Sequence, residues 1–411
     1  MNVYAFVILG TLVAGFLLDV IADYLNIKNL KPDLPEEFIG VYDKDTYKKS
    51  QKYLRTQTKF GYITSAYGIA VLLLFWFLGG FSRLNNLVVG WFSDDIIRGI
   101  FYIGILIAAN SILSLPFSIY STFVIEEKYG FNKTTPKTFI LDILKSVALG
   151  IVIGAPVLAG VIYILDNAGA YAWLYGWLGV SVIGLIIQFV APRWLMPLFN
   201  KFTPLGEGEL KTAILDYAGS VKFRVKNIFI MDGSKRSLKS NAFFTGFGKN
   251  KRIALFDTLI NNHTIGELVA VLAHEIGHYK KKHILQGMLL GFIHTGFLFF
   301  LLSVFISHKG LFQAFYFTDM PVYAGLIFFG MLYSPIELIL SVFMNIFSRK
   351  NEYEADKFSA VTTGKPVFLI DALKKLSKDN LSNLTPHPFY VFLNFSHPPV
   401  LERINALKKL E

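Results

Sequence analysis

Long apolar runs separated by polar stretches dominate this chain, and seven of them are long enough to cross a bilayer. As a helix, about 20 consecutive apolar residues span the hydrocarbon core. The seven runs cover residues 3–25, 62–81, 100–124, 143–165, 173–190, 284–306 and 322–347. The last contains Glu337, and an ionisable side chain within a bilayer should face protein or a water-filled cavity rather than lipid. The pattern predicts a mainly α-helical protein that crosses the membrane seven times.

The longest polar stretch, residues 201–283, separates the fifth apolar run from the sixth. Within it, apolar positions recur with a helical period over residues 207–221, which predicts an amphipathic helix. Residues 241–258 are rich in aromatic and β-branched residues and contain Gly246 and Gly248 at a turn-like sequence. This composition predicts a β-hairpin.

A further helix is expected to begin at Thr264, because Glu267 three residues later completes a capping box. The tail from residue 348 is polar and mostly helical in pattern, with a proline-rich loop at residues 385–399. We therefore divide the chain into four parts. They are a membrane part with five helices at residues 1–200, a polar part with the predicted hairpin at 201–283, a second membrane part at 284–347 and a C-terminal part at 348–411.

Composition and charge agree with this division and suggest an orientation. A hydrophobic fraction of 53%, with 17% charged residues and a mean hydropathy of +0.48, is too apolar for an ordinary soluble domain. Residues 27–59 hold eight Lys and Arg, whereas the opposite side of the membrane has only Arg83, Arg98 and Lys309. The positive-inside rule then places the N-terminus outside and the polar parts in the cytoplasm.

The net charge of +11 therefore indicates topology and a basic surface facing the membrane. No basic run is interleaved with a recognised RNA- or DNA-binding motif, so we expect a lipid bilayer and no nucleic acid as partner. The absence of cysteine excludes disulfides and Cys-ligated zinc, and leaves histidine and carboxylate as metal ligands.

The strongest chemical signal is His274-Glu275-Ile276-Gly277-His278. Two histidines four residues apart lie on one face of a helix, where both imidazoles can reach one zinc ion. Glu275 lies about 100° round the helix, beside that metal, where a general base can take a proton from zinc-bound water. The motif thus predicts a metallopeptidase.

A catalytic zinc needs a third protein ligand. A histidine six residues after His278 would give the metzincin pattern, but that position is Ile284. His283 is one residue short of it and is expected to point off the helix face.

The better candidates lie beyond the last membrane run. Glu352 and Asp356 are four residues apart on one helical face, whereas Glu354 is expected to face away. Two membrane crossings separate His278 from Glu352, so both return to the same side. We predict that Glu352 completes the metal site and that Asp356 accepts the second ring N–H of a ligating histidine.

Several motifs together resemble one family over nearly the whole chain, namely the type I CAAX prenyl endopeptidases. These are integral-membrane zinc metallopeptidases of the gluzincin kind. The matching motifs are residues 123–133, 197–205, 241–248 and 255–259, the His274–His278 motif, Glu352–Asp356, and residues 396–399 with Arg403.

The resemblance implies seven long helices around a water-filled chamber in the membrane, closed at the cytoplasmic end by one Zn²⁺ site. It also implies roles for individual side chains. His274, His278 and Glu352 would bind zinc, Glu275 would be the base, His397 and Arg403 would lie near the scissile carbonyl, and Asn241 would lie on a hairpin edge that pairs with an extended substrate.

These expectations define a membrane-embedded zinc metalloendopeptidase acting on peptides or proteins, with a prenylated C-terminus as a candidate substrate. Two alternatives stay open: a broad-specificity protease for membrane protein quality control, and a non-catalytic transporter with a structural zinc. The Lys-, Asn-, Ile- and Phe-rich usage indicates an AT-rich genome and favours a bacterial cytoplasmic membrane over the endoplasmic reticulum.

Overall fold

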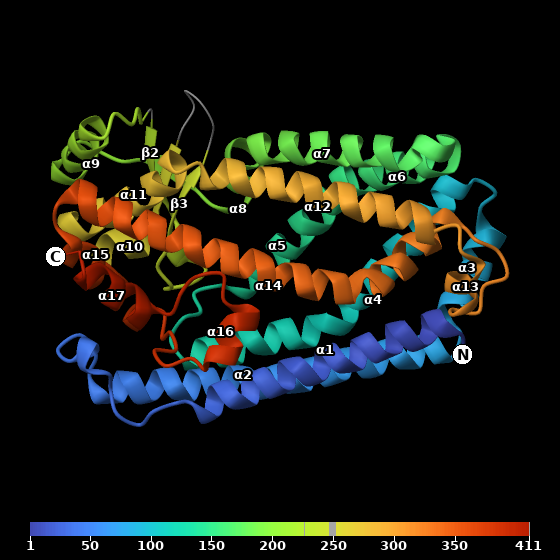
Figure 1. Cartoon of the computed structure of the whole chain (residues 1–411), viewed down its shortest axis with the longest axis horizontal. Helices are drawn as coiled ribbons and strands as arrows, with labels where there is room; N and C mark the ends of the chain where they lie inside the picture. The colour runs from blue at the N-terminus through green and yellow to red at the C-terminus, as the bar shows by residue number, and fades with distance from the viewer. Residues whose placement is uncertain (226, 246–251, 411) are drawn as a thin grey trace.

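Long helices running side by side form most of the molecule, and a small sheet with several shorter helices gathers at one end of them (Figure 1). The computed structural model describes residues 1–225, 227–245 and 252–410. Within these residues, seven helical segments are long and apolar enough to cross a membrane. The two termini lie at opposite ends of the long axis, as an odd number of crossings requires (Figure 1).

Each predicted apolar run corresponds to one spanning segment. The segments are α1 (Val3–Lys28), α2 (Lys44–Phe77), α4 (Asp95–Tyr120), α5 with α6 (Pro136–Leu149 and Ala155–Asn167), α7 (Ala172–Val190), α12 (His283–Phe305) and α14 (Val322–Thr363). Short π-helical turns extend or join three of them, at Ser121–Glu126, Gly150–Gly154 and Ala191–Leu195. The last leads into α8 (Met196–Phe199).

Several spanning segments begin or end at other residues than predicted; α2, for example, begins at Lys44 rather than at residue 62. Two of the differences bear on the fold. The second run was expected to continue to residue 81, but α2 ends at Phe77 and α3 (Gly80–Trp91) follows it. Gly79 lies between them with a φ of +72°, a left-handed conformation that stops the helix and that glycine adopts readily.

The seventh segment was expected to end at residue 347, yet α14 continues without a break to Thr363. Its 42 residues make a rod about 63 Å long, well beyond the thickness of a bilayer. Gly364 ends it in the left-handed conformation. The extension carries Glu352 and Asp356 out of the membrane on a rigid helix.

The intramembrane carboxylate Glu337 is paired. Its Oε2 lies 3.1 Å from His294 Nε2 on α12, and the same nitrogen lies 2.9 Å from the hydroxyl of Tyr333. About half of the Glu337 side chain, 53%, is exposed. Exposed charge of this kind is costly in lipid and tolerable in water, which agrees with the water-filled chamber, itself still a prediction.

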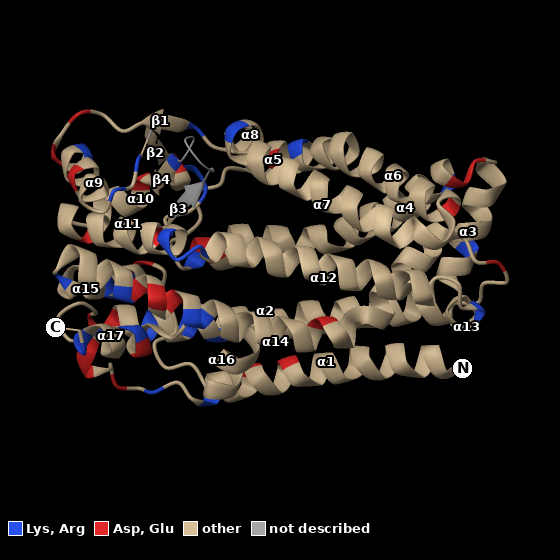
Figure 2. Cartoon of the chain, turned by 45° about the horizontal axis from the view of Figure 1, so that its top comes forward, with Lys and Arg blue, Asp and Glu red and all other residues tan. Residues whose placement is uncertain are grey.

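Charged side chains concentrate at the end of the molecule that holds α9 (Glu209–Ser220), α11 (Ile265–Lys280), α15 (Pro366–Asp379) and α17 (Val400–Lys408) (Figure 2). The spanning parts of the helices are almost free of charge in the same view. The polar part at residues 201–283 and the C-terminal part therefore lie at one end of the membrane helices. Their cytoplasmic location and the four-part division of the chain stay predictions.

Within the described residues, four strands form the sheet, in the order β1 (Phe202–Pro204), β2 (Asn227–Met231), β4 (Arg252–Phe256), β3 (Ala242–Thr245). Strands β2 and β4 are parallel, and the other two pairs are antiparallel. The two strands of the predicted hairpin are thus confirmed as β3 and β4, while the turn with Gly246 and Gly248 lies outside the described residues. Strand β3 is at one edge of the sheet.

Helix α11 is packed on two sides, and this fixes the position of the metal-binding motif. Leu268, Leu272 and Ile276 are buried in a core with residues of α9 and β4. On the other side α11 lies against α14, and at Gly277 an added Cβ would come within 3.1 Å of the Ala355 backbone. The predicted capping box at Thr264 is present.

The remaining elements surround this core. The predicted amphipathic helix is α9, followed later by α10 (Asp257–Asn262), and α13 (Lys309–Gln313) connects α12 to α14. The tail is helical as expected, with α15 and α17. The proline-rich loop at residues 385–399 also contains the short helix α16 (Pro388–Asn394), because Pro388 starts a helix well at its first position.

Candidate metal centre

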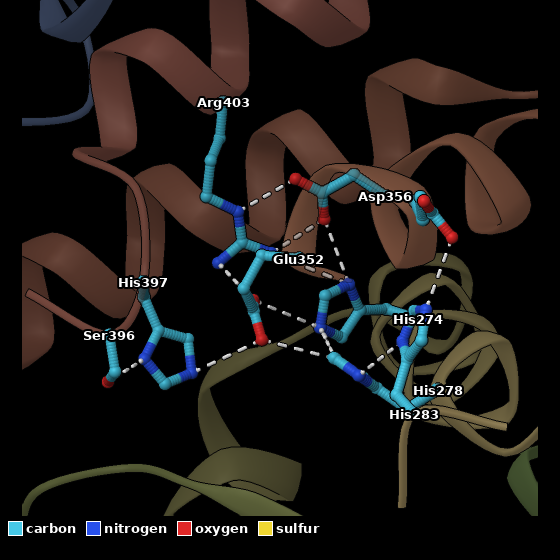
Figure 3. Close-up of polar contacts among 9 residues, drawn as sticks. His274, His278, His283, Glu352, Asp356, Ser396, His397 and Arg403 are labelled. Atoms are coloured by element: carbon cyan, nitrogen blue, oxygen red, sulfur yellow. Dashed lines mark hydrogen bonds and ion pairs between the residues drawn. The ribbon is translucent and has the colours of Figure 1, made fainter. Parts of the chain in front are cut away.

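His274 and His278 project from the same face of α11, as their spacing predicts. Their Nε2 atoms lie 3.1 Å apart and point toward a common centre (Figure 3). His274 is buried, with a 9% exposed side chain, and His278 is slightly more open, at 19%. Both histidines therefore present one ring nitrogen to the same point.

Glu352 of α14 brings a carboxylate to this point. Its Oε1 lies 3.2 Å from His278 Nε2, and its Oε2 lies 3.5 Å from His274 Nε2. One ligand atom from each of the three residues lies within 4.8 Å of the others. Ligand atoms about 2.0–2.1 Å from a tetrahedral zinc are separated by about 3.4 Å, so the three atoms are spaced as a zinc ion requires.

The polar atoms at this centre also fit a cation. Glu352 Oε2 is buried, yet within the described residues it has no hydrogen-bond partner. A buried acceptor without a donor costs free energy unless a cation compensates it. Two imidazoles and one carboxylate are a set of three protein ligands typical of a catalytic metal site.

Asp356 binds the ring nitrogen of His274 that faces away from the centre, as the sequence predicts. Its Oδ1 accepts a hydrogen bond of 2.8 Å from His274 Nδ1, which leaves Nε2 free for a metal. Burial by itself lowers the pKa of His274, but the hydrogen bond to Asp356 and the nearby Glu352 carboxylate outweigh it and raise the pKa to about 9. In the metal-free protein His274 is therefore protonated at neutral pH, and a metal must displace that proton.

Arg403 of α17 is held by the same carboxylate. Its Nε and Nη2 donate hydrogen bonds of 2.8 and 2.6 Å to the two oxygens of Asp356, and its Nη1 lies 3.5 Å from Glu352 Oε2. Burial lowers the pKa of Arg403, but the charges of Asp356, Glu352 and Glu275 together raise it. The guanidinium thus stays charged and holds the ligand carboxylates in place, and its predicted contact with a substrate carbonyl stays a prediction.

The Glu275 side chain is half-buried. Within residues 1–225, 227–245 and 252–410, no hydrogen bond or ion pair joins its carboxylate to another side chain. Its negative charge nevertheless contributes to the raised pKa of Arg403, so it lies close to the centre. A free carboxylate beside the metal is available as a general base, the role predicted for it.

His397 reaches the centre from the loop between α16 and α17 (Figure 3). Its Nε2 lies 3.4 Å from Glu352 Oε1, and its side chain is 65% exposed. Ser396 Oγ lies 3.0 Å from its other ring nitrogen. Arg349 holds the start of the loop by donating to the carbonyls of Val391 in α16, at 3.1 Å, and of Phe395. His397 thus lies at the exposed rim of the site, and its catalytic role stays a prediction.

Within the described residues, Asn241 forms no hydrogen bond with the other predicted site residues. It is exposed and directly precedes the edge strand β3, where its side chain accepts a hydrogen bond of 2.8 Å from the backbone of Ala242. Its own carbonyl accepts from the backbone of Phe256 at 3.2 Å. The predicted contact of Asn241 with a substrate stays a prediction.

Two residues that the sequence reasoning set aside belong to the centre. His283 Nδ1 lies 3.1 Å from His278 Nδ1, and His283 Nε2 lies 3.3 Å from Glu354 Oε2. The expectation that His283 points off the face assumed one continuous helix. Instead Lys282 takes a left-handed conformation, φ +62°, between α11 and α12 and turns His283 back toward α11.

Comparison with known proteins identifies relatives along the whole chain. Residues 23–201 match the family model described as CAAX prenyl protease N-terminal, five membrane helices, and residues 204–411 match peptidase family M48. The CAAX prenyl protease 1 homolog of Arabidopsis thaliana is 35% identical over 97% of this chain and 96% of its own length. CAAX prenyl protease 1 of Saccharomyces cerevisiae is 33% identical over 98% of this chain and 94% of its own length.

The fold has a solved counterpart. The crystal structure of S. mikatae Ste24p superposes with a TM-score of 0.92 at 34% sequence identity, covering 99% of both chains. This match confirms the predicted fold class of seven membrane helices with a small sheet.

The relatives correct one expectation. They come from plants, fungi and mammals, so the predicted bacterial cytoplasmic membrane is wrong. The relatives point to a eukaryotic membrane, which leaves the endoplasmic reticulum as the alternative considered from the sequence. The bias toward Lys, Asn, Ile and Phe reflects base composition, which does not separate bacteria from eukaryotes with AT-rich genomes.

Proposed function

Because this chain belongs to peptidase family M48 and is a membrane metallopeptidase acting on peptides or proteins, we propose that its metal is zinc and that it removes the C-terminal tripeptide of prenylated proteins. Membership confirms the predicted metalloendopeptidase over the transporter alternative. The single observation that carries the zinc assignment is the buried Glu352 oxygen without a hydrogen-bond partner, beside two imidazole nitrogens 3.1 Å apart.

The proposed reaction is hydrolysis of a peptide bond by water. When bound, zinc lowers the pKa of its water toward about 7 and polarises the substrate carbonyl. His274, His278 and Glu352 would hold the ion. The Glu275 carboxylate takes the proton from the attacking water and delivers it to the nitrogen of the departing amine.

Two side chains assist this reaction in our proposal. His397 Nε2, exposed at the rim of the site, donates a hydrogen bond to the oxyanion that forms at the scissile carbonyl. Arg403 holds Asp356 and Glu352 in position, and we propose that its Nη1, 3.5 Å from Glu352 Oε2, also lies near the scissile carbonyl of a bound substrate.

The substrate is proposed to bind as an added strand along the outer edge of β3, next to Asn241. Such pairing uses the backbone of both chains and therefore places few demands on side chains. A prenyl group anchors a protein C-terminus in the bilayer. A site at one end of seven membrane helices, with its charged surroundings in the cytoplasm, is suited to such an end.

Cleavage of paired peptides tests the proposal. A farnesylated CAAX peptide and its unprenylated twin are incubated with the purified protein, with and without a zinc chelator. We expect cleavage three residues from the C-terminus of the prenylated peptide only, loss of activity with chelator and recovery with zinc. Equal cleavage of both peptides would overturn the proposed substrate class and favour the quality-control alternative.

Replacing Glu275 tests the assignment of the base. Glu275→Gln should retain one zinc per chain but lose about 10²–10⁴-fold in rate, because the amide cannot accept the proton from water. Glu209→Gln, at an exposed carboxylate in the first turn of α9, is the matched control and should keep most of the rate. Full activity of Glu275→Gln would overturn the assignment.

A further inference from the structure

Each of the two histidines proposed to bind zinc has a partner at Nδ1, the ring nitrogen away from the centre. The sequence predicted only one of these two partners, Asp356. His274 gives its Nδ1–H to Asp356 at 2.8 Å. His278 Nδ1 faces the Nδ1 of His283 at 3.1 Å, on the side of the ring away from the centre (Figure 3). Since an imidazole that binds metal through Nε2 carries its proton on Nδ1, His278 must be the donor and His283 the acceptor in this contact.

This assignment also determines which nitrogen of His283 carries a proton. If His283 accepts at Nδ1, its own proton is on Nε2, and Nε2 lies 3.3 Å from Glu354 Oε2. Glu354 is a carboxylate and can only accept. One arrangement of protons therefore satisfies every contact from the metal-facing nitrogen of His278 to Glu354.

Burial and backbone conformation hold this arrangement. The His283 side chain is 4% exposed, whereas Glu354 is 42% exposed and in contact with solvent. The rings of His278 and His283 meet edge to face, with centroids 5.1 Å apart. The left-handed Lys282 places His283 against α11, and α14 supplies Glu354, so the support depends on the turn and on both helices.

We propose that His283, oriented by Glu354, is a positioning residue that holds His278 in the tautomer and ring orientation needed for metal binding. This inference rests on the proposed zinc site and adds a role that neither residue was assigned. Hydrogen-bonding partners of this kind typically change metal affinity or activity about 10–100-fold when they are removed. His283 does not touch substrate or metal and acts only through His278.

Two substitutions at the same position separate positioning from packing. His283→Leu fills much of the space but offers no acceptor to His278. His283→Asn puts an amide oxygen near the place of Nδ1 and restores the acceptor. Zinc affinity of the full-length protein in detergent is measured by competition with a chelator of known affinity, and metal-free thermal unfolding is recorded for each variant.

We expect His283→Leu to weaken zinc binding about 10–100-fold and His283→Asn to return to within a few-fold of the original protein. Glu354→Ala should weaken binding less, and it should have no further effect in the His283→Leu background, because it acts through His283. His308→Leu removes a histidine far from the site, beside Tyr4 and Phe305, and should leave zinc affinity unchanged.

The outcomes distinguish this inference from the proposed function. If the original protein binds one zinc and cleaves peptide, but His283→Leu binds zinc equally well, the positioning role is overturned and the proposed function stands. Equal losses of zinc affinity in His283→Leu and His283→Asn, with a matching drop in metal-free unfolding temperature, would also overturn the positioning role. They would show that His283 acts only by packing. A protein that binds no zinc at all would overturn both.

Discussion

Replacing Asp356 by leucine should separate the two tasks of this carboxylate, which are to support His274 and to neutralise Arg403. The Asp356 and Arg403 side chains are only 3% and 11% exposed and share two hydrogen bonds. In Asp356→Leu, the one ion pair left to the guanidinium within the described residues is with Glu352, at 3.5 Å. Removing one partner of a buried ion pair costs about 3–5 kcal/mol, because the other charge is left uncompensated.

The same substitution removes the acceptor of the His274 Nδ1–H, a hydrogen bond of 2.8 Å. We expect zinc affinity to fall about 10–100-fold, or about 1.4–2.7 kcal/mol, for this reason alone. In the double variant Asp356→Leu/Arg403→Met both charges are gone. The variant should regain most of the lost stability, since apolar residues of similar volume often replace a buried ion pair without loss. It should not regain zinc affinity.

Hydrogen exchange followed by mass spectrometry measures the stability term in the metal-free protein, because peptides from α11 and α14 report the free energy of local opening at the site. Chelator competition measures the zinc term. The reasoning is refuted if the double variant recovers full zinc affinity. It is equally refuted if Asp356→Leu opens α11 no more readily than the original protein.

Three further predictions follow from the packing and charge of α11. Gly277→Ala places a Cβ 3.1 Å from the Ala355 backbone and should destabilise the α11–α14 contact by about 1–3 kcal/mol in thermal unfolding, whereas Gly287→Ala, with open space around it, should be neutral. Thr264→Ala removes one half of the capping box and should speed hydrogen exchange in the first turn of α11, at a cost of about 0.5–2 kcal/mol, and unchanged exchange there would contradict the cap. Because the pKa of metal-free His274 is about 9, each zinc bound at pH 7 should release a proton from this ring, and apparent affinity should rise about tenfold per pH unit from pH 6 to 8. Calorimetry in buffers of different ionisation enthalpy counts that proton, and an affinity independent of pH would contradict the assignment.

The membrane helices and the ligand set could be predicted because both depend on short-range patterns. Seven apolar runs are long enough to span, and helical spacing alone puts His274 with His278 and Glu352 with Asp356. An even number of crossings between the two pairs then requires them to meet on one side. Hydropathy and helical period carry this information without any knowledge of tertiary contacts.

What could not be predicted depends on single backbone turns and on long-range partners. Lys282 has no sequence signature of a left-handed residue, so the return of His283 to the site was missed. Glu354 was excluded as a metal ligand because it faces away from Glu352 on the helix. On that other face it contacts His283, which no helical spacing indicates. Arg403 forms two hydrogen bonds with Asp356, which is 47 residues away in the sequence. No local sequence pattern predicts a pair so far apart.

X-ray absorption at the zinc edge of the purified full-length protein tests the central claim most directly. We predict one zinc per chain with two imidazole nitrogens and one carboxylate among its ligands at about 2.0–2.1 Å, and loss of the carboxylate contribution in Glu352→Ala. A protein without zinc, or a coordination shell that is unchanged in Glu352→Ala, would contradict the account.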